Sequence, residues 1–280
     1  MSVDLHLHTV HSDGSWLPAD LVERAVQLQL SHIAVTDHDT TAAVDEARAA
    51  AAGRLEVITG VEINTVWTRP DGSVTDVHLL GYYFDAGNKS LQDLLARQRN
   101  ARLDFVSDTI ESVRAAGVEL TFEQVQRHAG RGSVGRPHII RAIVEAGGAD
   151  DVDTAWEKFM TRTSPYYVER RSVSPQEAIG VLTRAGAVTS IAHPGKEEAL
   201  VPLIEELKPL GLCALEAYHR GHDLATVRRL MHVAAQNELV VSGGSDCHGS
   251  YNEYPAAIGT VLVPLDVVRG LEARVPVLGH

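Results

Sequence analysis

The chain has 280 residues, 44% of them hydrophobic, and a formal net charge of −12. This length and apolar content fit one large α/β domain with an insertion, and the negative charge disfavours binding to duplex nucleic acid or to an anionic membrane. Two cysteines provide no disulfide framework, and we find neither a signal-peptide pattern nor an apolar run of membrane-spanning length. We therefore expect a cytoplasmic protein, and no motif predicts a protein partner.

Seven apolar runs, rich in Val, Ile and Leu, predict strands that are buried on both faces. They are residues 3–9, 32–37, 55–65, 77–83, 187–192, 213–218 and 239–243. Helical patterns follow most of these runs, at residues 18–26, 41–52, 175–185, 201–209, 223–237 and 264–274. The alternation of strand and helix indicates a parallel, wound sheet that closes into a barrel.

A long helical segment interrupts this alternation between the fourth and fifth predicted strands. Its four helical patterns are residues 90–116, 121–128, 137–146 and 154–161. We interpret residues 89–172 as an inserted helical cap on a barrel formed by residues 1–88 and 173–280. Residues 97–171 hold 12 Lys+Arg against 11 Asp+Glu, a balance of +1, which leaves −13 for the remainder. A near-neutral, Arg-containing insert on an acidic barrel indicates a lid that binds an anion; the alternative is a solvated helical excursion.

Residues that ligate divalent cations recur at or near most of the predicted strands. One histidine at a strand end is usually structural, but a set spread over the strands of a barrel is expected to meet at one end of it. His6 and His8 lie two residues apart and so share one face of a strand, and Glu62 interrupts an apolar run where an unpaired carboxylate is costly. The complete set is His6, His8, Asp13, His38, Glu62, His78, His193, Asp246 and His248.

Imidazoles mixed with carboxylates favour Mn²⁺, Fe²⁺ or Zn²⁺ over Ca²⁺ or an all-thiolate zinc site. Asp37 and Asp39 flank His38, and we expect them to orient imidazoles or to shape the loop. Cys247 lies between Asp246 and His248, points the other way on a strand, and is assigned to packing.

Seven segments, taken in order, resemble the PHP (polymerase and histidinol phosphatase) family of metal-dependent phosphoesterases. They are HLHT, SDG, TDHD, GVEI, the strand with His78, AHPG and SDCH. The resemblance implies a distorted (β/α)7 barrel that binds two to three divalent ions, with Mn²⁺ favoured and Fe²⁺ or Zn²⁺ as alternatives. It implies three ligand sets, namely His6, His8, Glu62 and Asp246; Asp13, His38 and His248; and Glu62, His78 and His193.

A narrower resemblance concerns the insert, which contains a GRPH segment at residues 135–138 and an Arg-rich helix with Arg99 and Arg102. These features resemble the subgroup that removes the 3′-phosphate from nucleoside 3′,5′-bisphosphates, with relatives that trim short 5′-phosphorylated oligonucleotides. Arg99 and Arg102 share a helix face, and guanidinium groups bind phosphate in bidentate fashion. We expect substrate binding by Arg99, Arg102, Arg136, His138 and His219, with ordinary surface arginines as the alternative.

The resulting hypothesis is hydrolysis of a phosphate ester by a hydroxide that bridges two metal ions. The catalytic residues are then Asp13, His38, Glu62, His193, Asp246 and His248. Candidates for protonating the leaving group are His219, His222 and Asp39, and Tyr218 is a candidate for stacking on a base.

Three other functions remain open at this stage. Histidinol-phosphate phosphatase activity needs only one phosphate, so the arginine pair would be surplus. An amidohydrolase-type C–N hydrolase would use a similar metal barrel, but the arginines favour a phosphate. A non-catalytic metal-binding regulatory module would be expected to lack a ligand, and all nine positions are filled. We expect the partner to be a small phosphorylated substrate, either a nucleotide or a short oligonucleotide.

Overall fold

The computed structural model describes residues 2–130, 134–195, 199–249 and 257–276. The chain divides into two compact units, one formed by Met1–Ala96 with Val173–His280 and the other by Arg97–Ser172. Helix α3 (Lys89–Ala115) begins in the first of these units, and its residues from Arg97 onward belong to the second.

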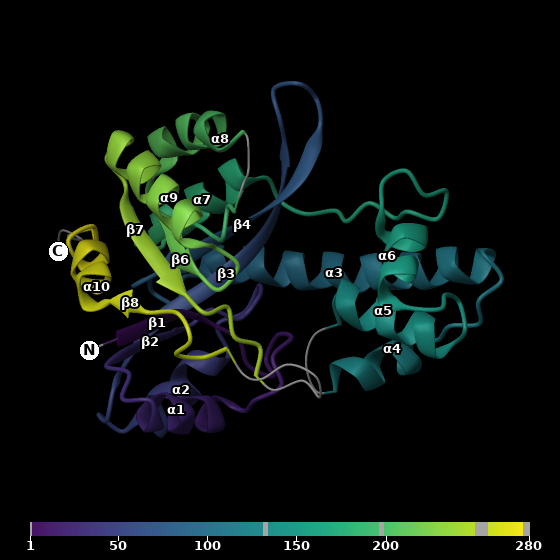
Figure 1. Ribbon diagram of the computed structural model, residues 1–280, viewed down its shortest axis with the longest axis horizontal. Helices are drawn as coiled ribbons and strands as arrows, with labels where there is room; N and C mark the ends of the chain where they lie inside the picture. The colour runs from purple at the N-terminus through teal and green to yellow at the C-terminus, as the bar shows by residue number, and fades with distance from the viewer. Residues whose placement is uncertain (1, 131–133, 196–198, 250–256, 277–280) are drawn as a thin grey trace. The chain divides into compact units, whose positions relative to one another are not determined.

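The first unit contains one sheet whose strands follow the order β7-β6-β5-β4-β3-β2-β1-β8 (Figure 1). The strands are β1 (Ser2–Leu7), β2 (His32–Val35), β3 (Glu56–Thr68), β4 (Val74–Tyr82), β5 (Val188–Ile191), β6 (Leu212–His219), β7 (Val240–Gly244) and β8 (Val263–Pro264). Leu7 at the end of β1 pairs with Cys247 beyond β7, and the His8 amide donates to the Cys247 carbonyl at 2.9 Å. Strands β1 to β7 thus form the distorted, nearly closed barrel that the sequence predicts.

Strand β4 is antiparallel to both of its neighbours, so the expectation of an all-parallel barrel is wrong for this strand. Residues 69–73 connect β3 to β4, and so short a connection allows only an antiparallel hairpin. The pairing places Asn64 opposite His78 and Glu62 opposite Leu80. Glu62 and His78 are therefore neighbours inside the barrel wall rather than residues at two parallel strand ends.

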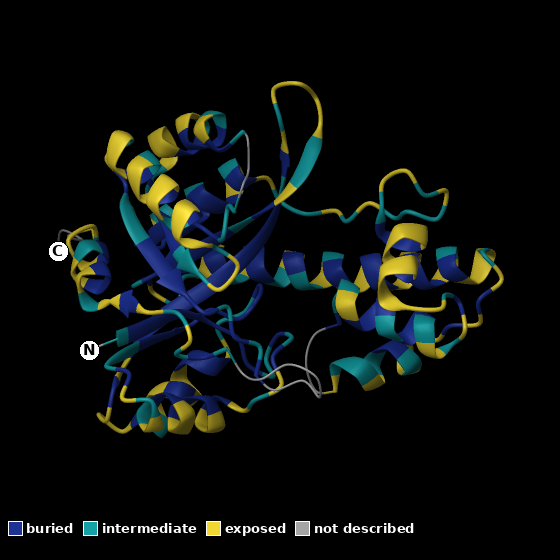
Figure 2. Cartoon of the chain, in the orientation of Figure 1, coloured by how far each residue is buried: buried dark blue, intermediate teal, exposed yellow. Residues whose placement is uncertain are grey.

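Six helices of the first unit correspond to the six helical patterns predicted around the strands. They are α1 (Pro18–Gln27), α2 (Ala43–Ala51), α7 (Pro175–Arg184), α8 (Leu200–Leu207), α9 (Leu224–Gln236) and α10 (Leu265–Glu272). Figure 2 shows buried strands covered by helices whose outer faces are exposed. Local signals fix several of the helix starts: Pro18 opens α1, and the Ser174 and Asp223 side chains accept backbone N–H groups at the starts of α7 and α9.

The second unit has a hydrophobic core of its own. Besides most of α3 it contains α4 (Phe122–Ala129), α5 (Arg136–Glu145) and α6 (Val152–Met160). Their buried side chains include Val106, Val113, Ile139, Ile143 and Phe159. Thr121 and Gln124 form a reciprocal capping box at the start of α4. No helix in the described ranges has the length and apolar content needed to span a membrane.

Candidate metal centre

Strand β1 and the residue that follows it bring two imidazoles to the same region of the barrel interior. His6 and His8 are buried, and their ring centroids are 5.2 Å apart, as strand alternation requires for residues two positions apart. The buried Asp4 carboxylate accepts hydrogen bonds from Ser245 N at 2.8 Å and Gly259 N at 3.3 Å. Burial raises the pKa of Asp4 to about 6. Asp4 ties β1 to the segment after β7, which carries the last two predicted ligands.

The loop after β1 is held by the buried Asp37, which follows β2. The Asp37 carboxylate accepts hydrogen bonds from Thr9 N and Thr9 Oγ1, both at 2.7 Å, and from Ser12 Oγ at 2.6 Å. At Gly14 a β-carbon would lie 2.6 Å from the His8 carbonyl oxygen, so this turn requires glycine. The turn brings Asp13 Oδ2 to 3.6 Å from His38 Nε2. Asp37 therefore shapes this loop, one of the two roles expected from the sequence.

Glu62 is the centre of the cluster. Its side chain is 1% exposed, and its two oxygens face imidazole nitrogens from four strands or their ends. Oε1 lies 2.9 Å from His78 Nδ1 and 3.1 Å from His193 Nε2. Oε2 lies 3.1 to 3.2 Å from nitrogens of His6, His8 and His38. Burial would raise the pKa of Glu62, but the surrounding imidazoles outweigh burial and hold it well below its usual value.

The segment after β7 completes the cluster. Asp246, in the left-handed region with φ of 51°, places Oδ1 3.4 Å from His6 Nε2 and 3.2 Å from His8 Nε2. His248 stacks on His8 with centroids 4.1 Å apart and brings Nε2 to 3.3 Å from Asp13 Oδ1. Cys247 between them is buried in a hydrophobic cluster, as expected from the sequence.

The cluster contains three groups of residues, and within each group the potential ligand atoms all lie within 4.8 Å of one another. They are His6, His8, Glu62 and Asp246; His8, Asp13, His38 and His248; and His38, Glu62 and His78. The first group equals one of the ligand sets implied by the sequence, and the second adds His8 to another. The third contains His38 where His193 was expected, although His193 Nε2 is itself 3.1 Å from Glu62 Oε1. All nine predicted residues thus meet in one cluster.

The donor atoms of this cluster fit divalent cations. His8 Nε2 is buried without a hydrogen-bond partner, although Glu62 Oε2 and Asp246 Oδ1 each lie 3.2 Å away. A neutral ring whose lone pair faces these carboxylates is costly unless a proton or a metal cation lies between them. Imidazole nitrogens and carboxylate oxygens together match Mn²⁺, Fe²⁺ and Zn²⁺.

Metal loading is expected to release protons. Burial would lower the pKa of His8, but the Asp246 and Glu62 carboxylates outweigh burial and raise it to about 10 in the metal-free protein. His8 is therefore protonated at pH 7, whereas a ligating imidazole must be neutral. Between pH 6 and 9 the apparent affinity for Mn²⁺ should rise about tenfold per pH unit for each proton released. Titration calorimetry in two buffers of different ionisation enthalpy measures this release, and equal heats in both buffers would contradict it.

Two of the three candidates for protonating the leaving group already form hydrogen bonds within the protein. His222 donates from Nδ1 to the Ala217 carbonyl at 2.9 Å and accepts at Nε2 from Gly195 N at 3.2 Å. Both oxygens of Asp39 accept from Asn64, at 3.2 Å and 3.0 Å. These two side chains fix loops beside the cluster.

His219 has a different environment. Its Nδ1 accepts the Gly221 amide at 3.0 Å, so the neutral ring carries its hydrogen on Nε2. That nitrogen is buried, has no hydrogen-bond partner, and lies 3.5 Å from Asp246 Oδ2. His219 therefore presents a donor to the cluster, and the structure brings this predicted substrate-binding residue to the metal centre.

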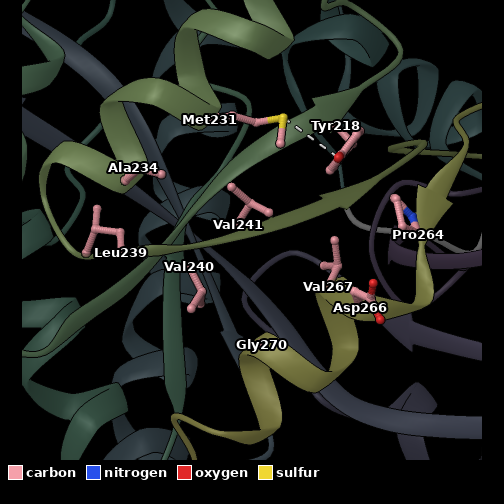
Figure 3. A pocket seen from close by; sticks show the side chains of 11 residues that line it. Tyr218, Met231, Ala234, Leu239, Val240, Val241, Pro264, Asp266, Val267 and Gly270 are labelled. Atoms are coloured by element: carbon pink, nitrogen blue, oxygen red, sulfur yellow. Dashed lines mark hydrogen bonds between the residues drawn. The ribbon is translucent and has the colours of Figure 1, made fainter.

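A β-bulge directs Tyr218 away from the cluster. The pairing of β6 with β7 shifts register between Glu216 and Tyr218, which reverses the alternation of side chains beyond that point. Tyr218 lines a largely apolar pocket of about 450 Å³ together with residues of α9, β7 and α10, and its hydroxyl lies 3.7 Å from Met231 Sδ (Figure 3). Base stacking by Tyr218 at the metal centre is therefore not supported.

Glu216 is a buried residue of the site that the sequence interpretation missed. It lies on β6, and its carboxylate accepts from His6 Nδ1 at 3.0 Å and His193 N at 2.6 Å. A signal for it existed, because Glu216 interrupts an apolar run in the same way as Glu62 does. The argument that a buried carboxylate needs a partner applies equally to both.

The other predicted substrate-binding residues belong to the second unit. Arg102 and His138 are buried there, whereas Arg99 and Arg136 are half-buried. Gly135 N donates to His138 Nδ1 at 3.0 Å, and a β-carbon on Gly135 would lie 3.9 Å from Arg102 Nη1. The structure thus brings Arg102 and His138 together at the N-terminus of α5, where the backbone dipole favours anions. Arg136 contributes a guanidinium 5.5 Å above the Phe105 ring.

Fold and site agree with the comparisons to known proteins. Residues 4–134 match the PHP domain. The chain is 32% identical to a 3′,5′-nucleoside bisphosphate phosphatase of Chromobacterium violaceum, over 88% of this chain and 87% of the relative. It is also 32% identical to the 5′-3′ exoribonuclease Rnm of Escherichia coli, over 88% and 84%. The chain therefore belongs to the PHP family and is a metal-dependent phosphoesterase.

A solved structure supports the fold across the whole chain. An amidohydrolase from Chromobacterium violaceum, determined with bound sulfate and without metal, superimposes with a TM-score of 0.84 at 30% identity. The match covers 98% of this chain and 97% of the solved one.

Proposed function

We propose that the nine clustered residues hold two to three divalent ions, with Mn²⁺ favoured and Fe²⁺ or Zn²⁺ as alternatives. The proposed ligand sets are those implied by the sequence, and the nine residues include the proposed catalytic groups Asp13, His38, Glu62, His193, Asp246 and His248. When bound, such ions lower the pKa of water and neutralise phosphoryl oxygens. The chain itself positions the ligands, because Asp4 and Asp37 fix the two loops that carry Asp13, Asp246 and His248.

The proposed reaction is removal of the 3′-phosphate from nucleoside 3′,5′-bisphosphates, with hydrolysis of short 5′-phosphorylated oligonucleotides as a related activity. The observation that carries this proposal is a pair of basic side chains that the second unit brings together. Arg102 and His138 meet at the N-terminus of α5, which suits a second phosphate. The names of the two curated relatives support the same substrate class.

Within this proposal the second unit recognises the part of the substrate that does not react. Arg102 and Arg136 offer guanidinium groups for bidentate hydrogen bonds to phosphate, and Arg99 precedes Arg102 on the same face of α3. His138 accepts the Gly135 amide at Nδ1, so its neutral ring carries its hydrogen on Nε2. His219 donates from Nε2 to an oxygen of the phosphate that reacts.

The role of His219 predicts a loss of kcat/KM. His219→Ala removes one hydrogen bond to a charged oxygen, which corresponds to about 10–100-fold in kcat/KM. His219→Gln, whose amide donates from nearly the same place, should recover part of that loss. Steady-state kinetics of phosphate release measures both variants. His232→Ala, an exposed position on α9, is the control and should behave as wild type; an equal loss in His219→Gln and His219→Ala would argue against donation.

The test of the proposed function is phosphate release by the metal-free protein after addition of Mn²⁺. Substrates are adenosine 3′,5′-bisphosphate, 5′-AMP, histidinol phosphate and a short 5′-phosphorylated RNA. We expect fast turnover of the bisphosphate, little release from 5′-AMP, and loss of activity on chelation. Preference for histidinol phosphate would establish the one-phosphate alternative.

The two remaining alternatives give different results in the same assay. A non-catalytic module would bind Mn²⁺ and hydrolyse none of the four compounds. An amidohydrolase-type enzyme would be equally inactive on phosphate esters but would cleave a C–N bond, which a panel of N-acyl and cyclic amide substrates detects. Either result would discard the proposed phosphatase reaction.

A further inference from the structure

A buried carboxylate outside the nine proposed ligands lies against the metal cluster. The Glu216 side chain is 0% exposed and is in none of the three groups of potential ligand atoms. A charged carboxylate in a protein interior costs several kcal/mol unless its oxygens are paired. Both Glu216 oxygens are paired, each with a different proposed ligand. The position of the Glu216 carboxylate therefore indicates a role other than packing.

The first partner of Glu216 is the ring of His6. Oε1 lies 3.0 Å from Nδ1, and an ionised carboxylate only accepts hydrogen bonds, so the neutral His6 ring carries its hydrogen on Nδ1. The lone pair of Nε2 then faces the cluster, where Glu62 Oε2 is 3.1 Å away and Asp246 Oδ1 is 3.4 Å away. Glu216 therefore selects the tautomer and the ring orientation in which His6 ligates a cation.

The second partner is the main chain of His193. His193 has a φ of 23°, outside the conformations that non-glycine residues prefer, and its amide donates to Glu216 Oε2 at 2.6 Å. In this conformation His193 Nε2 reaches Glu62 Oε1 at 3.1 Å. Gly195 N donates to His222 Nε2 at 3.2 Å, which holds the same loop from the segment after β6. The loop after β5 is thus shaped by contacts with β6 and the residues that follow it.

We propose that Glu216 is a positioning residue that orients two metal-ligating histidines from different strands at once. His6 and His193 belong to different proposed ligand sets, so one carboxylate couples the geometry of two ion sites. Glu216 acts through these histidines and does not itself bind an ion. The inference rests on the proposed metal centre, because it requires His6 and His193 to be ligands.

The test is Glu216→Gln in the full chain. A glutamine side chain has one acceptor oxygen and one donor NH₂ group, whereas His6 Nδ1–H and His193 N–H are both donors. One of the two contacts must fail, or His6 must move its hydrogen to Nε2 and lose its ligating lone pair. We expect the dissociation constant for Mn²⁺ to rise about 10–100-fold, as for other groups that orient metal ligands.

A spectroscopic readout separates positioning from a general structural effect. Two-bond ¹⁵N–¹H spectra of the Zn²⁺-loaded protein report which nitrogen of each histidine carries the hydrogen, and His6→Gln assigns the His6 signals by their loss. Wild type should show His6 with its hydrogen on Nδ1, and Glu216→Gln should lose this signature. Wild-type affinity for Mn²⁺ with an unchanged His6 signature in the variant would overturn the proposal.

Glu206→Gln is the matched control. Glu206 on α8 likewise accepts from two donors, here both side chains, Trp67 Nε1 at 3.0 Å and Gln176 Nε2 at 2.6 Å, but neither residue is a proposed ligand. This variant should bind Mn²⁺ as wild type does. If Glu216→Gln does not fold, Glu216→Asp keeps the charge but is one methylene shorter and cannot hold both partners, so wild-type affinity in that variant overturns the proposal as well. Failure of wild type itself to bind Mn²⁺ would instead reject the proposed metal centre.

Discussion

Glu62→Gln is expected to reduce kcat for phosphate release by about 10³-fold, which corresponds to roughly 4 kcal/mol of lost transition-state stabilisation. The substitution preserves the shape of the side chain and removes its charge. Both Glu62 oxygens face imidazole nitrogens at 2.9 to 3.2 Å, and two of the three ligand groups include Glu62. A neutral amide bridges cations poorly, so metal content should fall together with activity. Elemental analysis and steady-state kinetics on the same preparation measure both quantities.

The same strand provides the control for this prediction. Glu56 begins β3 and is exposed, so Glu56→Gln makes the identical chemical change away from the cluster. This variant should keep the wild-type metal content and kcat. If Glu62→Gln retained activity within tenfold of wild type at full metal content, Glu62 would not be the bridging carboxylate and the proposed ligand sets would need revision.

The cluster could be predicted from residue chemistry, because ionisable side chains are costly to bury unless they are paired with each other or with a cation. An apolar run that contains Glu62, or that leads into His38, His193 or Asp246, indicates a strand whose polar residues need a partner. Parallel strands of a barrel bring such residues to one end, so nine positions far apart in sequence were expected to meet. For the residues that follow parallel strands, the proximity in the structure follows from that topology, whereas Glu62 and His78 meet through the antiparallel pairing of β3 with β4. The identity of the ions does not follow from the residues.

The strand at residues 77–83 was predicted, but its antiparallel direction was missed although the signal for it is present in the sequence. Pro70-Asp71-Gly72 is a turn sequence, and the Ser73 amide and hydroxyl both bond Asp71 Oδ1. The strands extend to Thr68 and from Val74, beyond the apolar runs that end at residue 65 and restart at residue 77. The backbone hydrogen bonds between β3 and β4 continue beyond the apolar side chains. From the sequence, the short turn between the two strands therefore appeared to be a long loop.

The bulge in β6 could not be predicted from the periodicity of side chains along the strand. Alternation from the inward-facing Glu216 places Tyr218 inside and His219 outside, and the register shift reverses both. At Gly243, opposite the bulge, a β-carbon would lie 2.5 Å from Tyr218 Cβ, so the close approach of β7 depends on glycine. A single extra residue thus decides that an imidazole rather than a phenol faces the metal centre.

Arg102→Ala is expected to raise KM for adenosine 3′,5′-bisphosphate by about 10–100-fold. This increase corresponds to the loss of one charge-assisted hydrogen bond to phosphate, which contributes roughly 1.5–3 kcal/mol. Arg102 is 7% exposed and lies beside Gly135 and His138 at the N-terminus of α5. Adenosine 3′-monophosphate keeps the reacting phosphate but lacks the second one, so its KM should change little. Comparing the two substrates isolates recognition of the second phosphate from any change in the chemical step.

Two further variants separate charge, geometry and packing at this position. Arg102→Lys keeps the charge but loses the planar fork, so its KM for the bisphosphate should lie between those of wild type and Arg102→Ala. Arg127→Ala removes a guanidinium from α4 whose side chain is 62% exposed and should leave both KM values unchanged. Because Arg102 is buried, its loss also removes packing, but a packing defect would affect both substrates alike. Equal increases in KM for the bisphosphate and the 3′-monophosphate would therefore refute a role for Arg102 in binding the second phosphate.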